Sequence, residues 1–233
     1  APMSNTEPTR RRAVRSFVKR AGRLTASQEK ALANDWQVWG IDYSDAPVDL
    51  DSLFGRSAPR VLEIGFGNGD SLVEMAEANP ATDYLGVEVH EPGVGHCLIR
   101  ISEADVHNLR LVMHDAIDVL EHQLGKDSLD RVNLYFPDPW PKKRHHKRRI
   151  VNPPFLALVA SRLKAGGHLH IATDWENYAE HFDEALAGSS DFELEERRDH
   201  DGSQPLDRPA TKFEARGLRL GHRIWDWRFR RSG

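Results

Sequence analysis

From residue 60 onward, short apolar strand patterns alternate with amphipathic helical patterns, and this alternation restricts the folds open to the chain. The predicted strands cover 60–64, 84–89, 109–113, 130–136, 167–173, 191–197 and 223–229, and the predicted helices cover 70–79, 92–107, 115–123, 154–164 and 175–187. Such alternation is typical of a doubly wound, mostly parallel sheet with helices on both faces. We therefore predict an α/β fold with seven strands. The last two strands have no helix of comparable length between them, so they are expected to supply an antiparallel edge strand.

The part of the chain before the first strand divides into two segments. Residues 1–24 are polar and basic and lack an apolar helical stripe, so we predict a flexible arm. Residues 25–58 begin with a helix for which Thr25 or Ser27 is the predicted cap, and continue as a linker. Residues 59–233 are then expected to form the main domain.

Charge is distributed unevenly over a chain whose formal net charge is −4. Residues 10–23 carry seven Lys/Arg, residues 142–149 carry six, and residues 216–231 carry six against one acid. Basic patches on an otherwise acidic body indicate a polyanionic partner and favour a nucleic acid. No stretch approaches the roughly 20 apolar residues of a membrane helix. The single cysteine, Cys97, excludes an internal disulfide and fits a reducing cytoplasm.

The first predicted strand runs directly into a glycine-rich turn. Its glycines let the backbone approach a ligand at the carboxyl end of the strand; they are Gly65, Gly67 and Gly69. A dinucleotide fingerprint needs its third glycine one position later, where this chain has Asp70. A carboxylate there is poorly suited to a pyrophosphate, and Glu63 just upstream favours an ammonium group. The pattern therefore predicts a nucleoside that carries an amino acid, in preference to a dinucleotide.

Further acids follow the next three strands. Glu88 ends the second strand, Asp115 follows the third and Asp138 follows the fourth. Because the carboxyl ends of parallel strands meet in one crevice, we expect these acids to line it together with Glu63. Glu88 is then placed to bind ribose hydroxyls and Asp115 to lie near an adenine edge. Any one of these acids alone is explained equally well as a helix cap.

A proline-rich loop follows the fourth strand. Its three prolines at alternate positions prevent further strand pairing and stiffen the chain around Asp138 and Trp140. The next eight residues, 142–149, contain six Lys/Arg and two His. A held carboxylate can accept hydrogen bonds from a base edge, an indole can stack on a base, and a basic ribbon can neutralise phosphates. We therefore predict a nucleic-acid site here; a surface turn with a solvated charge run is the alternative.

These motifs together resemble the bacterial tRNA (guanine-N(7)-)-methyltransferases, class I enzymes that use S-adenosylmethionine. The resemblance rests on Glu63 with its glycines, Glu88, Asp115, the run from Phe136 to Lys142, Thr173 to Trp175, Thr211 to Glu214, and the arm from Arg15 to Arg23. It covers most of the chain and is weakest over 1–9, 41–58 and 188–207. It implies a Rossmann-like methyltransferase fold and methylation of N(7) of guanosine 46 in the variable loop of tRNA.

The resemblance also implies roles for individual residues. The cofactor positions are Glu63, Gly65, Gly67, Gly69, Glu88, Asp115 and Asp138, and Asp138 is also treated as catalytic. The substrate-side positions are Lys142, Asp174, Thr211, Lys212, Phe213 and Glu214. The residues expected to touch RNA are Arg144, His145, His146, Lys147, Arg148 and Arg149.

The chemistry of guanine narrows these roles. Its N(7) carries an in-plane lone pair and no proton, so attack on a sulfonium needs no base and alignment is the main contribution of the enzyme. Our hypothesis is that Asp138, helped by Asp174 or Glu214, accepts hydrogen bonds from guanine N(1)–H and the exocyclic amine. This would offset the positive charge that grows on the ring and would select guanine over adenine. The base must leave its stack, so Trp140 or Phe213 is predicted as a platform, with packing an equally good explanation for either ring.

Other functional classes are less consistent with the sequence. The basic segments argue against a methyltransferase for small molecules or proteins, and the four acids argue against a non-catalytic RNA-binding module. The position of the third glycine, together with Glu63, argues against an NAD-dependent oxidoreductase. No Cys/His spacing resembles a zinc site, so we predict no metal. A monomer is expected, with a homodimer as the alternative.

Overall fold

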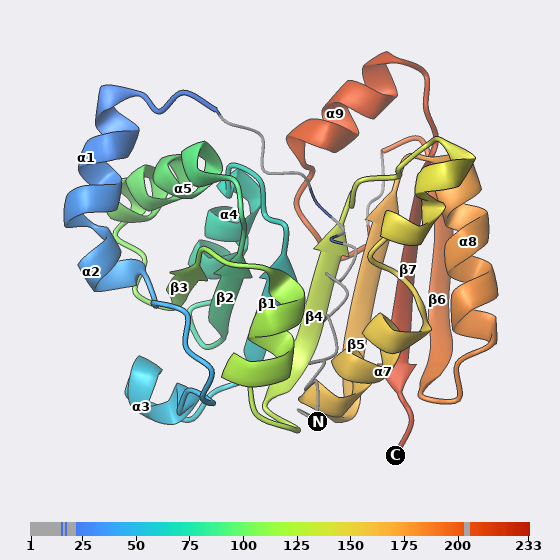
Figure 1. Cartoon of the computed structure of the whole chain (residues 1–233), viewed down its shortest axis with the longest axis horizontal. Coiled ribbons are helices and arrows are strands. Elements are labelled where there is room, and N and C mark those ends of the chain that lie inside the picture. The colour runs from blue at the N-terminus through green and yellow to red at the C-terminus, as the bar shows by residue number, and fades with distance from the viewer. Residues whose placement is uncertain (1–14, 16, 18–21, 203–205) are drawn as a thin grey trace, which may run out of the picture.

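The computed structural model describes residues 15, 17, 22–202 and 206–233, and its centre is one seven-stranded sheet (Figure 1). The strands are β1 (Arg60–Ile64), β2 (Asp83–Val87), β3 (Leu109–Val112), β4 (Leu129–Tyr135), β5 (Leu163–Thr173), β6 (Phe192–His200) and β7 (Ile224–Arg231). Their order in the sheet is β3-β2-β1-β4-β5-β7-β6. The α/β, mostly parallel sheet predicted from the sequence is confirmed.

Strand direction differs from the prediction in one respect. Strands β1 to β5 pair in parallel, and β7 pairs antiparallel with both β5 and β6. The antiparallel strand therefore lies inside the sheet, and β6 forms the edge. Burial explains this arrangement, because Trp227 and Phe229 of β7 are enclosed by both neighbours whereas Leu194 of β6 is exposed.

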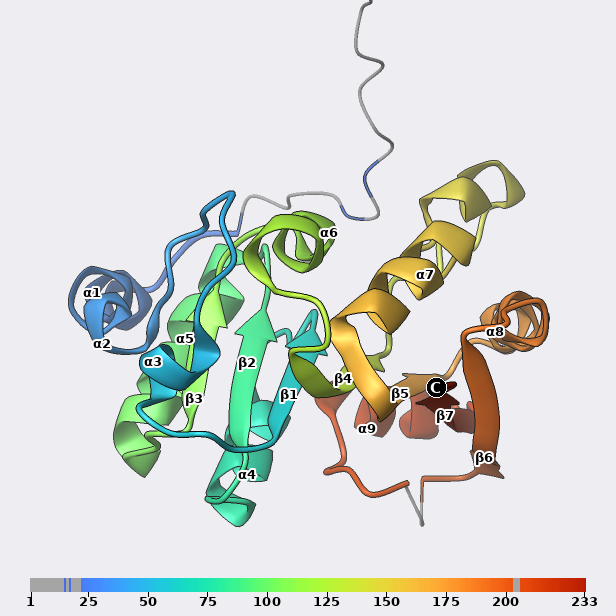
Figure 2. The same cartoon turned by 90° about the horizontal axis from the view of Figure 1, so that it is seen from below.

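Helices cover both faces of the sheet (Figure 2). The helices after β1 and after β2, namely α4 (Asp70–Ala78) and α5 (Glu91–Ala104), pack with α1 (Ala26–Asn34) against one apolar cluster. A second cluster lies on the other face beneath α6 (Ala116–Asp118) with the π-helical turn η1 (Val119–Gln123), α7 (Pro153–Arg162) and α8 (Glu176–Ala187). All five residues of β1 are buried, as expected for a central parallel strand covered on both faces. In the part of the chain that the structure describes, none of the helices has the length and apolar character to cross a bilayer.

The segment between the arm and β1 is packed more closely than predicted. Thr25 and Gln28 form a capping box that starts α1, and α2 (Trp36–Trp39) follows. Residues 41–58, predicted as a linker, contain α3 (Leu50–Phe54) and lie against the core through Leu50. Of the predicted arm, residues 1–14, 16 and 18–21 lie outside the described residues.

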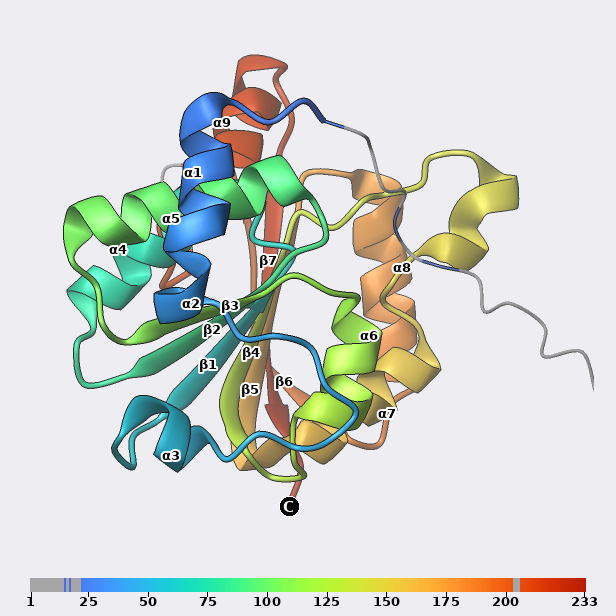
Figure 3. The ribbon, with the colours of Figure 1, turned by 60° about the vertical axis from the view of Figure 1, so that its left-hand side comes forward.

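Two local elements were not predicted from the sequence. Helix α9 (Lys212–Arg219) precedes β7 and lies beyond the carboxyl ends of β1 and β4 (Figures 1 and 3). Its start is a capping box formed by Thr211 and Glu214, a signal that the sequence does carry. The second element is the 3-10 turn η2 (Lys143–Arg148) in the basic ribbon.

Candidate functional site

The glycine turn after β1 has a backbone that only glycine adopts easily. Gly65, Gly67 and Gly69 have φ angles of +69°, +65° and +79°. At Gly69 a Cβ atom would also lie 2.2 Å from Sγ of Cys97, so a larger residue would clash with α5. The predicted close approach of backbone to a ligand therefore has a physical basis at this turn.

Glu88 holds the glycine turn in place. One carboxylate oxygen accepts a hydrogen bond from the Gly67 N–H at 2.8 Å, and the other accepts from Val89 at 2.8 Å and His90 at 3.1 Å. A carboxylate offers about four lone-pair sites, so about one stays available for a ligand hydroxyl. The position predicted for a ribose contact is thus compatible with the geometry.

A cavity of about 200 Å³ lies at the carboxyl ends of β1, β2 and β4. Three of the predicted cofactor acids line this cavity: Glu88, Asp115 and Asp138. Asp115 also caps α6, accepting a hydrogen bond from Ile117 N at 2.9 Å, and partial burial raises the pKa of its carboxyl. Helix capping and cavity lining are therefore compatible at this position.

The proline-rich loop after β4, which was predicted to be stiff, has strained backbone at two of its residues. Phe136 and Trp140 have φ angles of +52° and +43°, a region that L side chains rarely occupy. Asp138 accepts a hydrogen bond from Trp140 N at 3.0 Å, which fixes its carboxylate at the cavity. The expected held carboxylate is present.

Glu63 is the most perturbed acid of the crevice. It is 2 % exposed, and its Oε1 atom has no hydrogen-bond partner among the described residues. Burial raises the pKa of Glu63 from 4.5 to about 8, an effect only partly opposed by Arg131 and Arg208. An uncompensated buried acid at a cavity wall is suited to a cationic group of a ligand.

Glu63 faces a second, larger cavity of about 1200 Å³, which continues the first. The two cavities share the glycine turn and three aromatic residues; the shared lining is Gly65, Gly67, Tyr135, Phe136 and Phe213. Phe213 projects from α9 with 55 % exposure, and its ring lies 3.6 Å from where a Cβ of Gly67 would be. Of the two predicted platforms, Phe213 is therefore the accessible one.

Trp140 has a different role from the predicted platform. It is only 9 % exposed, with the Arg148 guanidinium 4.9 Å above its ring and His145 edge-on at 5.9 Å. These contacts fasten η2 to the proline-rich loop.

The basic ribbon is only partly available to a ligand. Lys142, Lys143, Arg144 and Lys147 are exposed, whereas His145, His146 and Arg148 are half-buried. Arg149, predicted to touch RNA, is 2 % exposed and donates to Pro139 O and Asn177 Oδ1, each at 2.8 Å. It thus anchors the ribbon to α8, because the guanidinium also covers the Tyr178 ring at 4.7 Å.

The substrate-side residues fall into two groups. Thr211, Lys212 and Phe213 line the large cavity. Lys142 and Asp174 line neither cavity, and Asp174 lies against Gly217 of α9 and pairs with His222 Nδ1 at 3.2 Å.

Glu214, the last substrate-side residue, is buried in an ionic network. It is 1 % exposed and accepts hydrogen bonds from Arg208 at 2.7 and 3.2 Å and from Thr211 N at 3.2 Å. Arg208 in turn pairs with Asp226 of β7 at 2.8 Å. The hypothesis that Glu214 accepts hydrogen bonds from the base therefore does not match its geometry; it ties α9 to the sheet.

Two histidines complete this network on Asp226. His170 Nε2 and His200 Nε2 lie 2.8 and 2.6 Å from its carboxylate oxygens. Burial lowers the pKa of His170 to about 4, so the ring is neutral, while hydrogen bonds from His170 and Arg208 hold the pKa of Asp226 below its usual range against the effect of burial. His170 is therefore a buried, hydrogen-bonded residue of the fold.

The third basic stretch is largely neutralised. Arg223, Arg228, Arg230 and Arg231 pair with carboxylates of β6 and of neighbouring loops. Arg216 and Arg219 of α9 are exposed and have no acidic partner within the described ranges. Counting charges in sequence therefore overestimated the cationic surface at this end of the chain.

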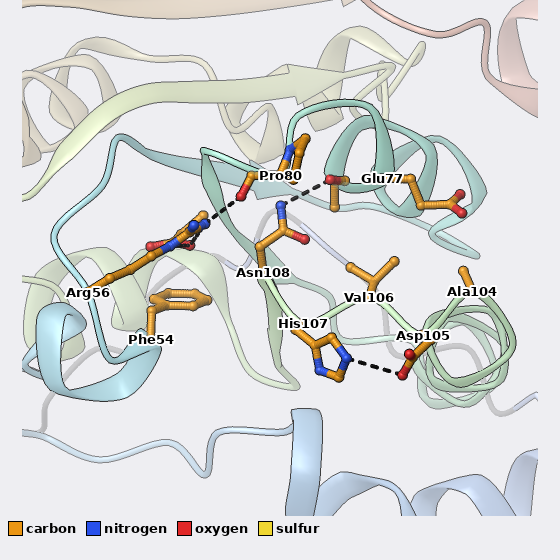
Figure 4. Close-up of a pocket in the computed structure, with 11 residues that line it drawn as sticks. Phe54, Arg56, Glu77, Pro80, Ala104, Asp105, Val106, His107 and Asn108 are labelled. Carbon is orange, nitrogen blue, oxygen red and sulfur yellow. Dashed lines mark hydrogen bonds and ion pairs between the residues drawn. The ribbon is translucent and has the colours of Figure 1, made fainter.

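A further cavity lies at the opposite end of the sheet (Figure 4). Its volume is about 530 Å³, and most of its charged side chains are paired within the protein: Arg56 with Asp83 at 2.6 Å and His107 with Asp105 at 3.2 Å. Asn108 donates to backbone carbonyls of Ala76, Asn79 and Thr82. Its polar groups thus serve the fold, and the crevice at the carboxyl ends is the better candidate site. Across residues 15, 17, 22–202 and 206–233, no three His, Cys, Asp or Glu side chains converge as a metal site would require.

The sheet order and the crevice define a class I methyltransferase fold, and solved structures agree. The chain is similar to an antibiotic-related methyltransferase (TM-score 0.58, 17 % identity, 82 % of this chain and 94 % of that chain). It is also similar to the 16S rRNA (adenine(1408)-N(1))-methyltransferase of Catenulisporales acidiphilia (TM-score 0.56, 16 % identity, 80 % and 92 %).

Sequence relatives define the family more narrowly. A family model described as a putative methyltransferase matches residues 57–227. The tRNA (guanine-N(7)-)-methyltransferase of Yersinia enterocolitica is 55 % identical over 222 residues, covering 95 % of this chain and 92 % of that protein. The enzyme of the same name from Shewanella piezotolerans is 53 % identical over 227 residues, covering 97 % and 96 %. The chain therefore belongs to the tRNA (guanine-N(7)-)-methyltransferase family, and the predicted resemblance is confirmed.

Proposed function

We propose that this protein transfers the methyl group of S-adenosylmethionine to N(7) of guanosine 46 in the variable loop of tRNA. Family membership supports the reaction, and the crevice supports it chemically. The observation that carries the assignment to this crevice is Glu63, a buried acid with an unpartnered oxygen beside the glycine turn. An ammonium group is the ligand that such an acid stabilises best.

The cofactor fits the residues along the crevice. We assign its amino-acid end to Glu63, its ribose to Glu88 and its adenine end to Asp115, with the glycine turn beneath. When bound, it supplies a methyl group on an already activated sulfonium. Gly65 and Gly67 add no side chain of their own to this stretch of backbone, and Glu88 holds it in place.

Asp138 is assigned the catalytic role. Its carboxylate accepts a hydrogen bond from Trp140 N and lies at the wall of the smaller cavity, which Phe136 and Pro137 also line. From there it is suited to accept hydrogen bonds from the guanine N(1)–H and exocyclic amine, which orients N(7) and offsets charge on the ring. Phe213 supplies the stacking surface for the extruded base. Glu214 acts indirectly, because it positions α9 and hence Phe213.

RNA binding is assigned to the exposed cations of the ribbon, Lys142, Lys143, Arg144 and Lys147. The division into an arm (1–24), an N-terminal segment (25–58) and a methyltransferase domain (59–233) belongs to the same proposal. We further propose a monomeric, cytoplasmic enzyme.

The test is transfer of labelled methyl from S-adenosylmethionine to unmodified bulk tRNA, followed by nucleoside analysis. We expect label in 7-methylguanosine only. Label on another nucleoside would keep the fold and refute the assigned chemistry. Binding of tRNA without any transfer would favour an RNA-binding module.

A further inference from the structure

We propose that the groove between α9 and α5 is a second RNA-binding tract, in which Arg216 and Arg219 neutralise phosphates of the strand that flanks the target nucleotide. This inference rests on the proposed function, because it identifies where the same RNA substrate continues beyond the crevice. It concerns the outer part of the large cavity, which none of the assigned cofactor contacts occupies.

The size of the groove exceeds what the cofactor needs. Its volume is about 1200 Å³, whereas pockets for small ligands usually measure about 300–1,000 Å³. Only its inner end, at Glu63 and the glycine turn, belongs to the cofactor site. The outer end extends along α9 as far as Arg219. Figure 1 shows α9 and the start of α5 on the two sides of this region, beyond the carboxyl ends of the strands.

The α9 wall of the groove is cationic. Lys212, Arg216 and Arg219 stand at positions i, i+4 and i+7 and therefore share one face of the helix. Arg216 and Arg219 have no acidic partner in the part of the chain that the structure describes, unlike the four paired arginines that follow. Like charges at such spacing destabilise a helix by a few tenths of a kcal/mol, and an anionic ligand bound on this face would relieve that repulsion.

The opposite wall adds weak donors and little negative charge. His90 and His96 lie there, and besides the buried Glu63 the acid of the groove is the half-buried Asp70. Asp70 is already paired, with His96 at 2.9 Å and Arg100 at 3.5 Å, and Lys212 lies 4.0 Å away. The groove thus keeps a positive surplus, which suits a phosphate backbone.

The groove is also continuous with the place where the base would enter. Phe213, one residue after Lys212, lines both cavities. The basic ribbon leaves the crevice from the loop after β4, and the α9 groove leaves it past the glycine turn. A nucleotide extruded onto Phe213 would therefore have one flank at the ribbon and the other at Arg216 and Arg219.

The experiment compares two double variants that remove the same charge. Arg216→Gln with Arg219→Gln tests the groove. Arg223→Gln with Arg230→Gln is the matched control, since both arginines are exposed but paired with Asp199 and Glu193. Equilibrium binding of an unmodified tRNA transcript is measured from 50 to 200 mM KCl, together with KM for tRNA, the melting temperature and the affinity for S-adenosylhomocysteine.

The slope of log K against log salt is negative, and we expect it to be less steep by about 2 in the groove variant, one for each lost phosphate contact. Its affinity for tRNA should fall at least about tenfold in 50 mM salt, with S-adenosylhomocysteine binding and melting temperature unchanged. The control should keep the wild-type slope. A wild-type slope in the groove variant, equal changes in both variants, or a loss of melting temperature alone would overturn the inference. Failure of the wild-type protein to methylate tRNA would instead refute the proposed function.

Discussion

Glu63 gives the sharpest prediction, because its protonation is linked to cofactor binding. With a pKa of about 8 in the free protein, about nine in ten molecules carry the Glu63 proton at pH 7. An ammonium group placed against the carboxylate stabilises the ionised form. Binding should therefore release about 0.9 proton per ligand at pH 7. Ionising the acid costs about 1.4 kcal/mol at that pH, so ligand affinity should rise nearly tenfold between pH 6 and pH 7.

The assay is titration calorimetry of S-adenosylhomocysteine in buffers of different ionisation enthalpy at pH 6 to 7. The ligand's own α-amino group titrates at higher pH, near 8 or above, so the difference between the wild-type protein and Glu63→Gln isolates the protein's proton. The variant should bind more weakly and release no proton from this position. Glu74→Gln, on the exposed side of α4, is the control and should behave like the wild type.

Protein stability supplies an independent check, because it should fall with rising pH whereas ligand affinity should rise. The unfolded chain releases the Glu63 proton above pH 4.5, whereas the folded chain keeps it until about pH 8. The free energy of unfolding of the ligand-free protein therefore falls as the pH rises between these values. At pH 7 this lowers stability by about 3 kcal/mol, which Glu63→Gln should largely restore. Equal proton release by the wild type and Glu63→Gln, or a less stable variant, would refute the reasoning.

Substitutions at three further residues test the remaining roles. Asp138→Asn keeps an acceptor for Trp140 N but loses the charge, so kcat should fall about 10²–10³-fold with cofactor affinity less affected; near wild-type turnover would contradict the catalytic role. Glu214→Ala leaves the buried Arg208 with one carboxylate partner fewer, so the free energy of unfolding from thermal denaturation should fall by about 3–5 kcal/mol. Unchanged stability would instead favour the original hypothesis that Glu214 contacts the base directly. Phe213→Ala should lower kcat/KM for tRNA by a factor that corresponds to about 1–3 kcal/mol of lost stacking, with little change in melting temperature, whereas Phe213→Trp should retain activity. If Phe213→Ala has no effect on kcat/KM, Phe213 is not the stacking platform.

Regular elements and the crevice acids were largely predictable from the sequence. The helices and strands from β1 to β5 follow hydrophobic periodicity, which the covered parallel sheet enforces. Asp138 was predictable as a held carboxylate because alternate prolines leave the loop few conformations. In each case the structural constraint is local in sequence.

Properties that depend on distant residues were not predictable. The burial of Glu214 requires Arg208 and Asp226, which meet only when β7 enters the sheet. Arg149 lies within a basic run but is covered by α8. Sequence periodicity reports neither partner, because such pairs have no fixed spacing along the chain.

The third basic stretch shows the same limit for charge. Arg228 and Arg230 of β7 are opposed by acids of β6, the neighbouring strand, and Arg231 is paired with Asp127. Within the described residues of this stretch, only the two arginines of α9 have no acidic partner. Net charge of a segment therefore predicts a nucleic-acid surface only when the strand or helix next to it in space is known.

The most direct test of the central claim replaces one atom of the substrate. A tRNA carrying 7-deazaguanosine at position 46 keeps the edge that Asp138 is proposed to read but lacks the nucleophilic nitrogen. We predict that it binds with the affinity of the unmodified guanosine transcript and accepts no methyl group at any enzyme concentration. Methyl incorporation into that transcript equal to the guanosine control would show that the enzyme alkylates another atom, and would contradict the account.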